Sequence, residues 1–463
     1  MRRTLIIILA LSVCTLSFAQ KKSDIVKTGI NIGPLPAVAY DADKGLQIGA
    51  ILQLFDYGDG SNYPNYDAKT YLEYSHYTKG SNLIQLRHDN KVLIPDVRWS
   101  TSLRINLDKA FDFYGLNGYQ SVYNYDLVEQ GKDKSSSFPI FTPFYKMKNN
   151  QFMLKSDFLG RITDNLQWEA GIFAYYFDIA TIDYDNINKG KAEGKEFPSG
   201  VPTLFDIYKA AGVISETEAD GGMASGLRAG LVYDTRDKEG APSKGIWAEA
   251  HISAALPGIS ETPYYRYSAT WRHYLPIIPN DVLTFAYRLN YEGNFGDSAP
   301  FYATPYLTVM GEKNDCDGMG GFFNVRGIMR NRVNGLDMAT YNAELRWRFT
   351  KFTLWNQNIA LGLNIFSDGT TVTRAYDLGK LETYAKTLGT ISSLTGLNLQ
   401  SGVVADRSDS FHITAGAGFR FIMNENFIVA ADYGLPITHL MKNSPLYNQD
   451  GTGAFYINLG YLF

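Results

Sequence analysis

The alternation of large apolar residues with small or polar ones most constrains what this chain can fold into. It is clearest in the last stretch, residues 455–463, where the large apolar positions are Phe455, Ile457, Leu459, Tyr461 and Phe463. A strand whose outer face meets lipid and whose inner face meets water needs this two-residue period. The stretch therefore predicts a final strand in the wall of a membrane-spanning barrel.

The same period recurs along the chain, for example at residues 283–291, 341–349 and 411–421. A helix would scatter these apolar residues around its circumference, and no capping signals accompany them. We therefore predict an all-β fold, a transmembrane antiparallel β-barrel of about 16 strands. The expected strands are residues 44–57, 66–77, 80–90, 96–106, 115–127, 148–161, 165–178, 224–236, 244–256, 263–275, 281–294, 337–350, 357–367, 410–423, 426–437 and 452–463.

The amino terminus has the pattern of an export signal. Arg2 and Arg3 precede the apolar run 5–11, and small residues follow at 17–19. This order is typical of a secretory signal that is cleaved, and no later apolar run has the length of a spanning helix. We expect a signal peptide at 1–19, a short periplasmic segment at 20–43 and an outer-membrane β-barrel domain at 44–463, in a Gram-negative bacterium.

Connection lengths predict which way the barrel faces. Short turns are expected near residues 78–80, 162–165, 276–280, 351–356 and 423–426, and long connections at 179–223, 295–336, 368–409 and 438–451. Bacterial barrels combine short periplasmic turns with long outer loops. The long connections are therefore predicted to lie outside the cell.

One long connection has an unusual composition. Residues 313–330 hold apolar and aromatic side chains beside glycines and Arg326, a mixture that is costly to expose at a cell surface. We predict that this loop folds back into the lumen, where Arg326 meets the inward-facing carboxylates Glu344 and Asp368. An ordinary surface turn is the alternative.

Several motifs in sequence order point to a known family. The loop carries Gly320, Gly321, Val325, Arg326 and Gly327. A strand-turn motif upstream carries Asp234, Arg236, Asp237, Pro242 and Gly245, and downstream lie 342–345, 366–369, 416–420 and the final Phe463. Together they resemble the BamA/TamA-like outer-membrane protein superfamily, also called the bacterial surface antigen family. The likeness is densest over residues 224–463.

The chain also departs from the family pattern. An aromatic residue usually follows Arg-Gly in the lumenal loop, and here Ile328 stands there. The glycine after the second acidic residue comes one place early, at Gly369. Family assembly factors carry periplasmic POTRA domains, for which residues 20–43 leave no room, so the resemblance implies a barrel-only member.

The resemblance implies two functional features. Arg326 would pair with Glu344 and Asp368 and fix the loop to the wall, since a guanidinium fork can serve two carboxylates. Strand 44–57 would pair with 452–463 in a weak seam that can open sideways toward a client strand. Gly453 and Gly460 in the last strand are consistent with a weak seam.

No pattern in the chain indicates an enzyme. The six histidines lack zinc-ligand spacing, and no nucleophile elbow or phosphate loop occurs. We therefore expect no catalytic residues, no metal and no cofactor. The net charge of −4 argues against nucleic acid as a partner.

The sequence favours a non-enzymatic membrane role. We expect insertion or translocation of a protein or lipid client, with the outer-membrane bilayer and further periplasmic or outer-membrane proteins as partners. The alternative is a porin-like channel or a structural barrel without assembly activity. A weaker third interpretation is a surface receptor that acts through loops 179–223 and 368–409.

Overall fold

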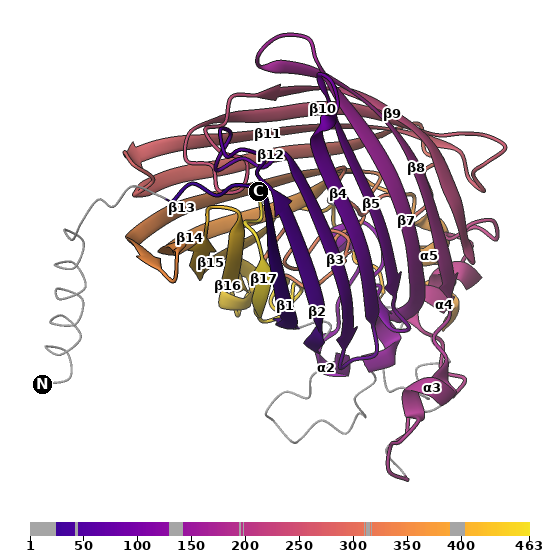
Figure 1. Ribbon diagram of the computed structural model, residues 1–463. Helices are drawn as coiled ribbons and strands as arrows, with labels where there is room; N and C mark the ends of the chain where they lie inside the picture. Colours follow the sequence, from indigo (N-terminus) through magenta and orange to yellow (C-terminus); the bar gives the residue numbers. More distant parts are fainter. Residues whose placement is uncertain are drawn as a thin grey trace, which may run out of the picture.

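The computed structural model is an antiparallel ring of strands that encloses several long loops (Figure 1). It describes residues 25–41, 45–128, 142–193, 196–197, 199–309, 311, 315, 317–388 and 403–463; the expected signal peptide at 1–19 lies outside them. Neighbouring strands pair in chain order, and β17 meets β1. The expected all-β antiparallel barrel fold is thus confirmed.

The described strands are β1 Ile30–Asp41, β2 Gly45–Asp56, β3 Ala68–Tyr77, β4 Asn82–Ile94, β5 Val97–Leu107, β6 Phe111–Asp112, β7 Lys146–Arg161, β8 Leu166–Ala180, β9 Gly221–Asp234, β10 Gly245–Ala255, β11 Tyr264–Ile278, β12 Leu283–Phe295, β13 Asp337–Leu354, β14 Gln357–Arg374, β15 His412–Met423, β16 Phe427–Pro436 and β17 Ala454–Leu459. The short helices are η2 Gly118–Gln120, α2 Tyr125–Val128, η3 Thr142–Tyr145, α3 Tyr184–Asn188, α4 Leu204–Ala210, α5 Gly379–Thr387 and α8 Ile437–Leu440. Within the described ranges, no helix is long and apolar enough to span a membrane.

The ring begins earlier than the sequence indicated. Residues 30–41 form β1 and pair with β2 along their whole length, so the expectation of a periplasmic segment at 20–43 and a barrel starting at residue 44 was wrong. Two prolines in this stretch, Pro34 and Pro36, argue against a central strand and hid it from the alternation analysis.

The expected strand at 115–127 was also wrong. The two errors cancel in the count of wall strands, because the two-residue β6 pairs only with β7 while β5 pairs directly with β7, so β6 lies outside the wall. Gly115, Asn117 and Gly118 all adopt positive φ angles, of 86°, 65° and 56°, which break an extended strand. The segment instead forms η2 and α2 and packs inside the barrel. Its apolar residues are buried against other loops rather than facing lipid.

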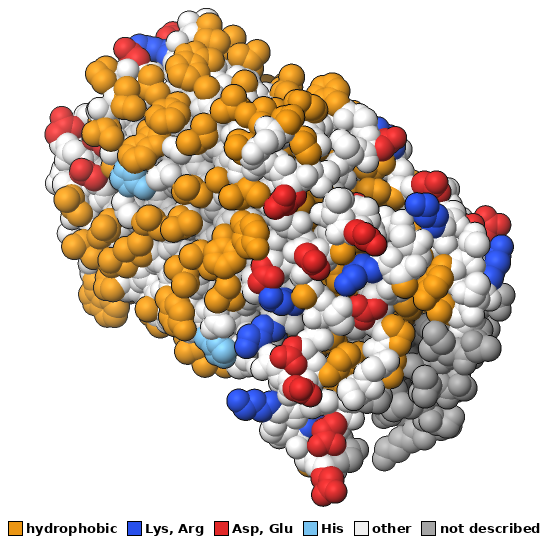
Figure 2. All heavy atoms as spheres, turned by 90° about the vertical axis from the view of Figure 1, so that its right-hand side faces the viewer, with side chains coloured by type: hydrophobic (Ala, Val, Ile, Leu, Met, Phe, Trp, Pro, Cys, Tyr) orange, Lys and Arg blue, Asp and Glu red, His pale blue; other side chains and the backbone are white. Residues whose placement is uncertain are grey.

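The outer face of the ring is apolar, as the two-residue period predicts. On β2, Leu46 and Ile48 are 40% and 55% exposed, while Gln53 on the inner face is buried. On β12, Leu289 points outward, whereas Arg288 and Asn290 are buried inside. Figure 2 shows apolar side chains gathered over the strand wall and charged side chains gathered toward one end.

The two ends of the ring differ in their connections. We call the end with the turns 162–165, 279–282, 355–356 and 424–426 the short-turn end, and the opposite end the long-loop end. Because 115–127 was counted as a strand, the turn 78–81 was assigned to the same end as the turn 162–165, whereas it lies at the long-loop end. The helices α2 to α5 gather at that end (Figure 1).

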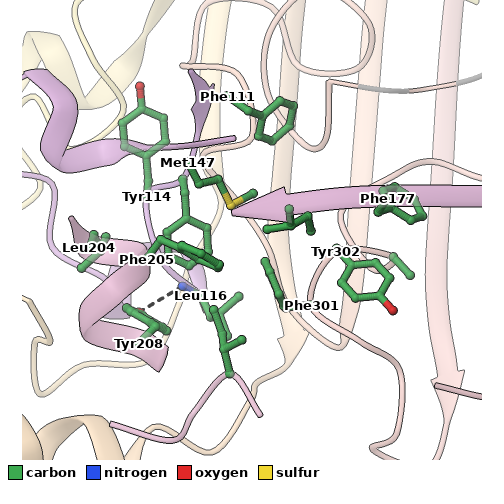
Figure 3. Close-up of a cluster of buried hydrophobic side chains, with 14 of the residues drawn as sticks. Phe111, Tyr114, Leu116, Met147, Phe177, Leu204, Phe205, Tyr208, Phe301 and Tyr302 are labelled. Atoms are coloured by element: carbon green, nitrogen blue, oxygen red, sulfur yellow. Dashed lines mark hydrogen bonds between the residues drawn. The ribbon is translucent and has the colours of Figure 1, made fainter. Parts of the chain in front are cut away.

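The long loops pack together into one aromatic cluster at the long-loop end (Figure 3). Phe113 meets Phe205 and Tyr208 of α4 in edge-to-face contacts, with ring centroids 5.8 and 5.3 Å apart. The Tyr208 hydroxyl accepts a hydrogen bond from the main-chain nitrogen of Leu116 at 3.1 Å. Since edge-to-face aromatic pairs add to the free energy of burial, this cluster fixes the loops over the lumen.

The chain turns inward before its last residue. β17 ends at Leu459, and Gly460 has φ +97°. Phe455 is 40% exposed on the outer face, but Tyr461 and Phe463 are each only 7% exposed. The expectation that 452–463 continues as a wall strand to Phe463 was therefore wrong, because the positive φ at Gly460 redirects the segment into the lumen.

Candidate functional site

The connection between β12 and β13 folds into the lumen, where residues 317–336 form what we call the lumenal loop. Asn324 organises its tip: its side-chain nitrogen donates to the Gly318 carbonyl at 2.7 Å, and its oxygen accepts from Gly320 nitrogen at 2.6 Å. Gly320 has φ +118°, and a Cβ there would lie 2.0 Å from the Met329 carbonyl oxygen. The tip therefore requires glycine at this position.

Asp315 precedes this tip and is buried. One of its carboxylate oxygens accepts hydrogen bonds from Leu307 nitrogen at 3.0 Å and from the Asn324 side chain at 3.1 Å. Burial nevertheless raises the pKa of Asp315 to about 7, because desolvation penalises the charged form. The base of the lumenal loop thus contains a group that titrates near neutrality.

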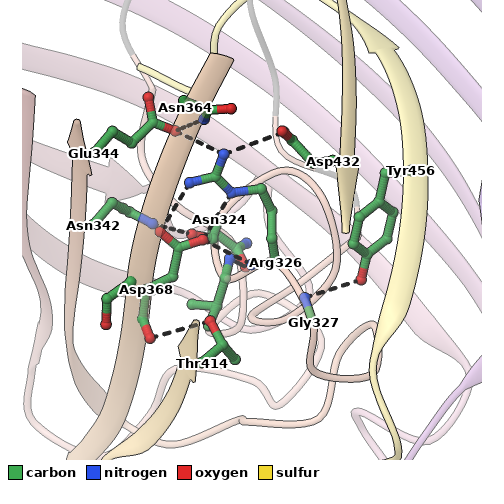
Figure 4. A network of polar contacts seen from close by, with 12 residues as sticks. Asn324, Arg326, Gly327, Asn342, Glu344, Asn364, Asp368, Thr414, Asp432 and Tyr456 are labelled. Carbon is green, nitrogen blue, oxygen red and sulfur yellow. Dashed lines mark hydrogen bonds and ion pairs between the residues drawn. The ribbon is translucent and has the colours of Figure 1, made fainter. Parts of the chain in front are cut away.

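Arg326 is the most heavily paired side chain of the lumenal loop (Figure 4). Its guanidinium donates to both oxygens of Asp368 on β14, at 2.8 and 3.1 Å. Glu344 on β13 lies 2.7 Å from its Nη1, and Asp432 on β16 lies 3.2 Å from the same atom. All four side chains are fully buried, and the guanidinium stacks 3.6 Å from the Phe366 ring.

The structure therefore brings Arg326 together with the two carboxylates that the sequence proposed, and adds a third. Asp432 was missed because no family motif covers it. Its inward parity on the strand 427–436 was a signal that could have identified it. Arg420 donates to Asp432 at 2.9 Å and Arg346 to Glu344 at 2.6 Å, so cations and anions alternate across these strands.

Gly327 lets the lumenal loop touch the wall. A Cβ on Gly327 would lie 2.6 Å from the main-chain carbon of Gly434 on β16. The main-chain nitrogen of Gly327 donates to the Tyr456 hydroxyl on β17 at 3.3 Å. Val325 and Ile328 are fully buried in a small apolar cluster beside it, so an aliphatic side chain fits at position 328.

Two further buried arginines extend the lumenal loop to other loops. Arg330 pairs with Asp108 at 2.8 Å and with Asp112 at 2.9 Å. Arg332 donates to the carbonyls of Gly118 and Ser121 at 3.0 and 3.1 Å. The lumenal loop is thus held on opposite sides of the lumen, which makes it a plug rather than a hinged flap.

The strand-turn motif closes the other end of the lumen. Arg236 makes a two-point ion pair with Asp234, at 3.0 and 2.7 Å. Asp237 accepts from Ser243 nitrogen at 2.9 Å, beside the buried Pro242. Gly245 has φ +106°, and a Cβ there would meet the Thr235 carbonyl oxygen at 2.2 Å.

This turn, residues 235–244, reaches two distant parts of the ring. Glu239 pairs with Lys91 at 2.8 Å and with Arg98 at 3.2 Å, while Arg348 on β13 donates to Ala241 oxygen at 3.1 Å. Burial alone would raise the pKa of Glu239, but Arg98 and Lys91 lower it to about 2. The turn therefore spans the short-turn end of the lumen in a charged, ordered state.

The seam between the first and last strands is the weakest contact of the ring. β1 and β17 share one ladder pair, Asp41 with Tyr456, whereas β1 pairs with β2 over all its residues. A cavity of about 300 Å³ lies beside the seam, lined by both edges and by Phe322 and Phe323 of the lumenal loop. The cavity therefore brings the lumen close to the lipid-facing surface of the barrel at the seam.

The prolines of β1 stop the seam from extending beyond the end of β17. Tyr57 nitrogen donates to the Gly29 carbonyl at 3.0 Å, so the odd-numbered residues of β1 form the hydrogen-bonded pairs with β2. The even-numbered Pro34 and Pro36 then direct their nitrogens to the edge that faces β17. Proline has no N–H to donate, so this edge cannot form a regular ladder.

A latch crosses the seam at the short-turn end. We define it as residues 25–29 and the β2–β3 loop, 57–67. The Asn358 side chain, at the base of β14, exchanges hydrogen bonds of 3.1 and 3.0 Å with the main chain of Ile25. Asn426, at the base of β16, donates to the Tyr57 hydroxyl at 3.1 Å. These contacts do not involve β1 or β17 themselves, so they hold the two sides of the seam together at the short-turn end.

The C-terminal segment 460–463 lies inside the lumen next to this seam. The Phe463 carbonyl oxygen accepts from Arg346 at 2.9 Å. The Arg346 guanidinium lies 4.2 Å from the Tyr461 ring centre and 4.8 Å from that of Phe463. Aromatic and cationic contacts therefore replace the strand pairing that the sequence predicted here.

A family model described as the Omp85 superfamily domain matches residues 94–463. A search of curated proteins gave no match. Similar solved structures include CdiB from Escherichia coli, with TM-score 0.50, 9% identity and coverage of 94% of this chain and 64% of that chain. BamA from Haemophilus ducreyi lacking POTRA domains 1–3 gives TM-score 0.47 at 14% identity, with coverage of 94% and 70%. At 9% identity, the likeness to CdiB extends to the fold alone.

Proposed function

The chain belongs to the Omp85 superfamily, and from this premise we propose that it inserts or translocates a client at the seam between β1 and β17. The client is a protein or a lipid, and partner subunits supply its periplasmic recognition. The observation that carries the proposal is the seam itself. It has a single ladder pair, and hydrogen bonds across a strand edge are what resist separation of a barrel wall.

The closed lumen supports a sideways route over an axial one. The lumenal loop and the turn 235–244 both cross the lumen, and the loop cluster covers its long-loop end. A client that entered along the axis would have to displace buried ion pairs. At the seam it would displace one ladder pair and the latch.

A disulfide across the seam tests the proposal. Tyr40 and Ile457 are the next opposite positions in the register of Asp41 and Tyr456, and both side chains face outward. The pair Tyr40→Cys and Ile457→Cys, with Cys316→Ser, should form a lock. Val38 and Ile48, an outward pair inside the β1–β2 ladder, give the control disulfide.

The readout is envelope protein content in cells depleted of the native protein. We expect the oxidised seam lock to fail to restore it, reduction to recover it, and the control pair to restore it in both states. Full activity of the locked form would contradict the proposal. It would favour the alternative, a channel or structural barrel.

A further inference from the structure

Among the described residues, nine arginines are buried: Arg228, Arg266, Arg272, Arg288, Arg326, Arg330, Arg332, Arg346 and Arg420. Each of them except Arg288 makes an ion pair with a carboxylate. Arg288 on β12 is only 4% exposed. A buried cation without a counter-ion is costly, so its surroundings require an explanation.

The neighbours of Arg288 increase this cost. Arg288 stands directly opposite Arg272 in the β11–β12 register, and like charges at opposed positions destabilise a sheet. Its Nε donates to the Asn342 side-chain oxygen at 2.8 Å and its Nη2 to the Asn324 carbonyl at 3.5 Å, and the Phe463 ring centre lies 5.4 Å away. All of these partners are neutral. On β10, Glu249 pairs with Arg272 rather than with Arg288.

A cavity of about 240 Å³ lies in front of the two arginines, on the side of the short-turn end. Asp234 and Glu239 are the acidic side chains that line it, and they are engaged by Arg236 and Arg98. The last residue, Phe463, also lines it, and its main-chain oxygen is engaged by Arg346. The cavity therefore has spare positive charge. Its volume accommodates a small oxyanion with several waters, since one water occupies about 30 Å³ in the liquid.

We propose that Arg288, with Arg272 beside it, forms an oxyanion site that binds a phosphate group. A guanidinium matches phosphate geometry in a two-point contact, and the bound charge would remove the repulsion between the two arginines. The phosphate can be free or belong to a lipid headgroup. A lipid is favoured because the cavity shares Phe323, Leu459 and Leu462 with the seam cavity, so the two spaces adjoin.

Phosphate titration of the purified full chain in an alkyl maltoside micelle tests the site. We expect inorganic phosphate, at constant ionic strength against chloride, to raise the heat-unfolding midpoint saturably. In Arg288→Gln the apparent affinity should fall at least tenfold. Arg161→Gln, which removes an exposed cation paired with Asp96, should respond like the native chain.

A second readout does not depend on phosphate. Without it, Arg288→Gln should be at least as heat-resistant as the native barrel, because one of two opposed charges is gone. Arg288→Lys, which keeps the charge, should retain a weaker phosphate response. The site is refuted if phosphate acts no differently from chloride, or if Arg288→Gln responds like the native chain.

Mixed micelles identify the source of the phosphate. Phosphatidic acid should compete with inorganic phosphate, whereas diacylglycerol, which lacks the phosphate, should not. If the seam-locked protein no longer shows this competition, the lipid enters sideways through the seam. Only this comparison with the seam-locked protein rests on the proposed function. No competition by phosphatidic acid would overturn the lipid source and leave free phosphate as the occupant.

Discussion

Replacement of Arg326 by glutamine should destabilise the barrel more than loss of any single partner of its network. Every hydrogen bond to the Asp368 carboxylate in the described structure comes from Arg326. Glu344 would keep Arg346, and Asp432 would keep Arg420. Only Asp368 is left buried without a cationic partner, with the main-chain nitrogen of residue 326 as its remaining donor, and loss of one partner of a buried ion pair costs about 3–5 kcal/mol.

Two matched variants isolate this effect. Arg346→Gln also removes a buried arginine, but its partner Glu344 keeps Arg326 at 2.7 Å. Its cost should be that of a hydrogen bond to a charged group, about 1.5–3 kcal/mol. Arg326→Gln combined with Asp368→Asn should be more stable than Arg326→Gln alone, because no unpaired carboxylate remains.

Urea unfolding in lipid vesicles, followed by tryptophan fluorescence, measures these free energies. Trypsin provides a second readout, because Arg330 and Arg332 are buried and become cleavable only if the lumenal loop leaves its place. The reasoning is refuted if Arg326→Gln unfolds at the same urea concentration as Arg346→Gln and keeps the loop protected.

Three further predictions concern the loop and the latch. Gly327→Ala should expose the lumenal loop to trypsin, since its Cβ would meet Gly434 at 2.6 Å, whereas Gly258→Ala, with open space around it, should not. Asn358→Ala should slow disulfide formation between cysteines at 40 and 457, because the latch loses its contacts with Ile25 and the two positions are held opposite each other less of the time; an unchanged rate would contradict the latch. Burial raises the pKa of Asp315 to about 7, so the free energy of unfolding should fall as pH rises from about 4 to about 7 and then level off, by about 1.4 kcal/mol per pH unit at most. A series of urea midpoints against pH checks this, and Asp315→Asn should remove the slope.

The wall of the barrel could be predicted because lipid imposes a period on the sequence. Residues such as Leu289 and Arg288 alternate strictly, and the structure places them on opposite faces. The period fails where other forces produce a similar pattern. Aromatic residues such as Phe113 and Tyr119 look lipid-facing in the sequence, but they pack in a loop cluster and inside the lumen. The positive φ angles that interrupt the segment leave only weak signals in the sequence.

The predicted partner of the last strand, 44–57, was wrong for a related reason, since β17 meets β1 instead. Strand rules exclude prolines from central positions, but β1 is in effect an edge strand, so Pro34 and Pro36 are tolerated there. The inward turn at Gly460 also reverses the assignment of Tyr461 and Phe463, which continue the lipid-facing period in sequence alone. The pairing of Arg326 was easier to predict, because Glu344 and Asp368 occupy inward positions on the neighbouring strands β13 and β14.

Distance measurement across the seam tests the central claim most directly. Spin labels at positions 40 and 457, compared by pulsed electron paramagnetic resonance in lipid bilayers with labels at 38 and 48, report the two strand pairs. We predict a broad or two-component distance distribution for the seam and a single narrow one for the β1–β2 control. Equally narrow distributions for both pairs would contradict an opening seam.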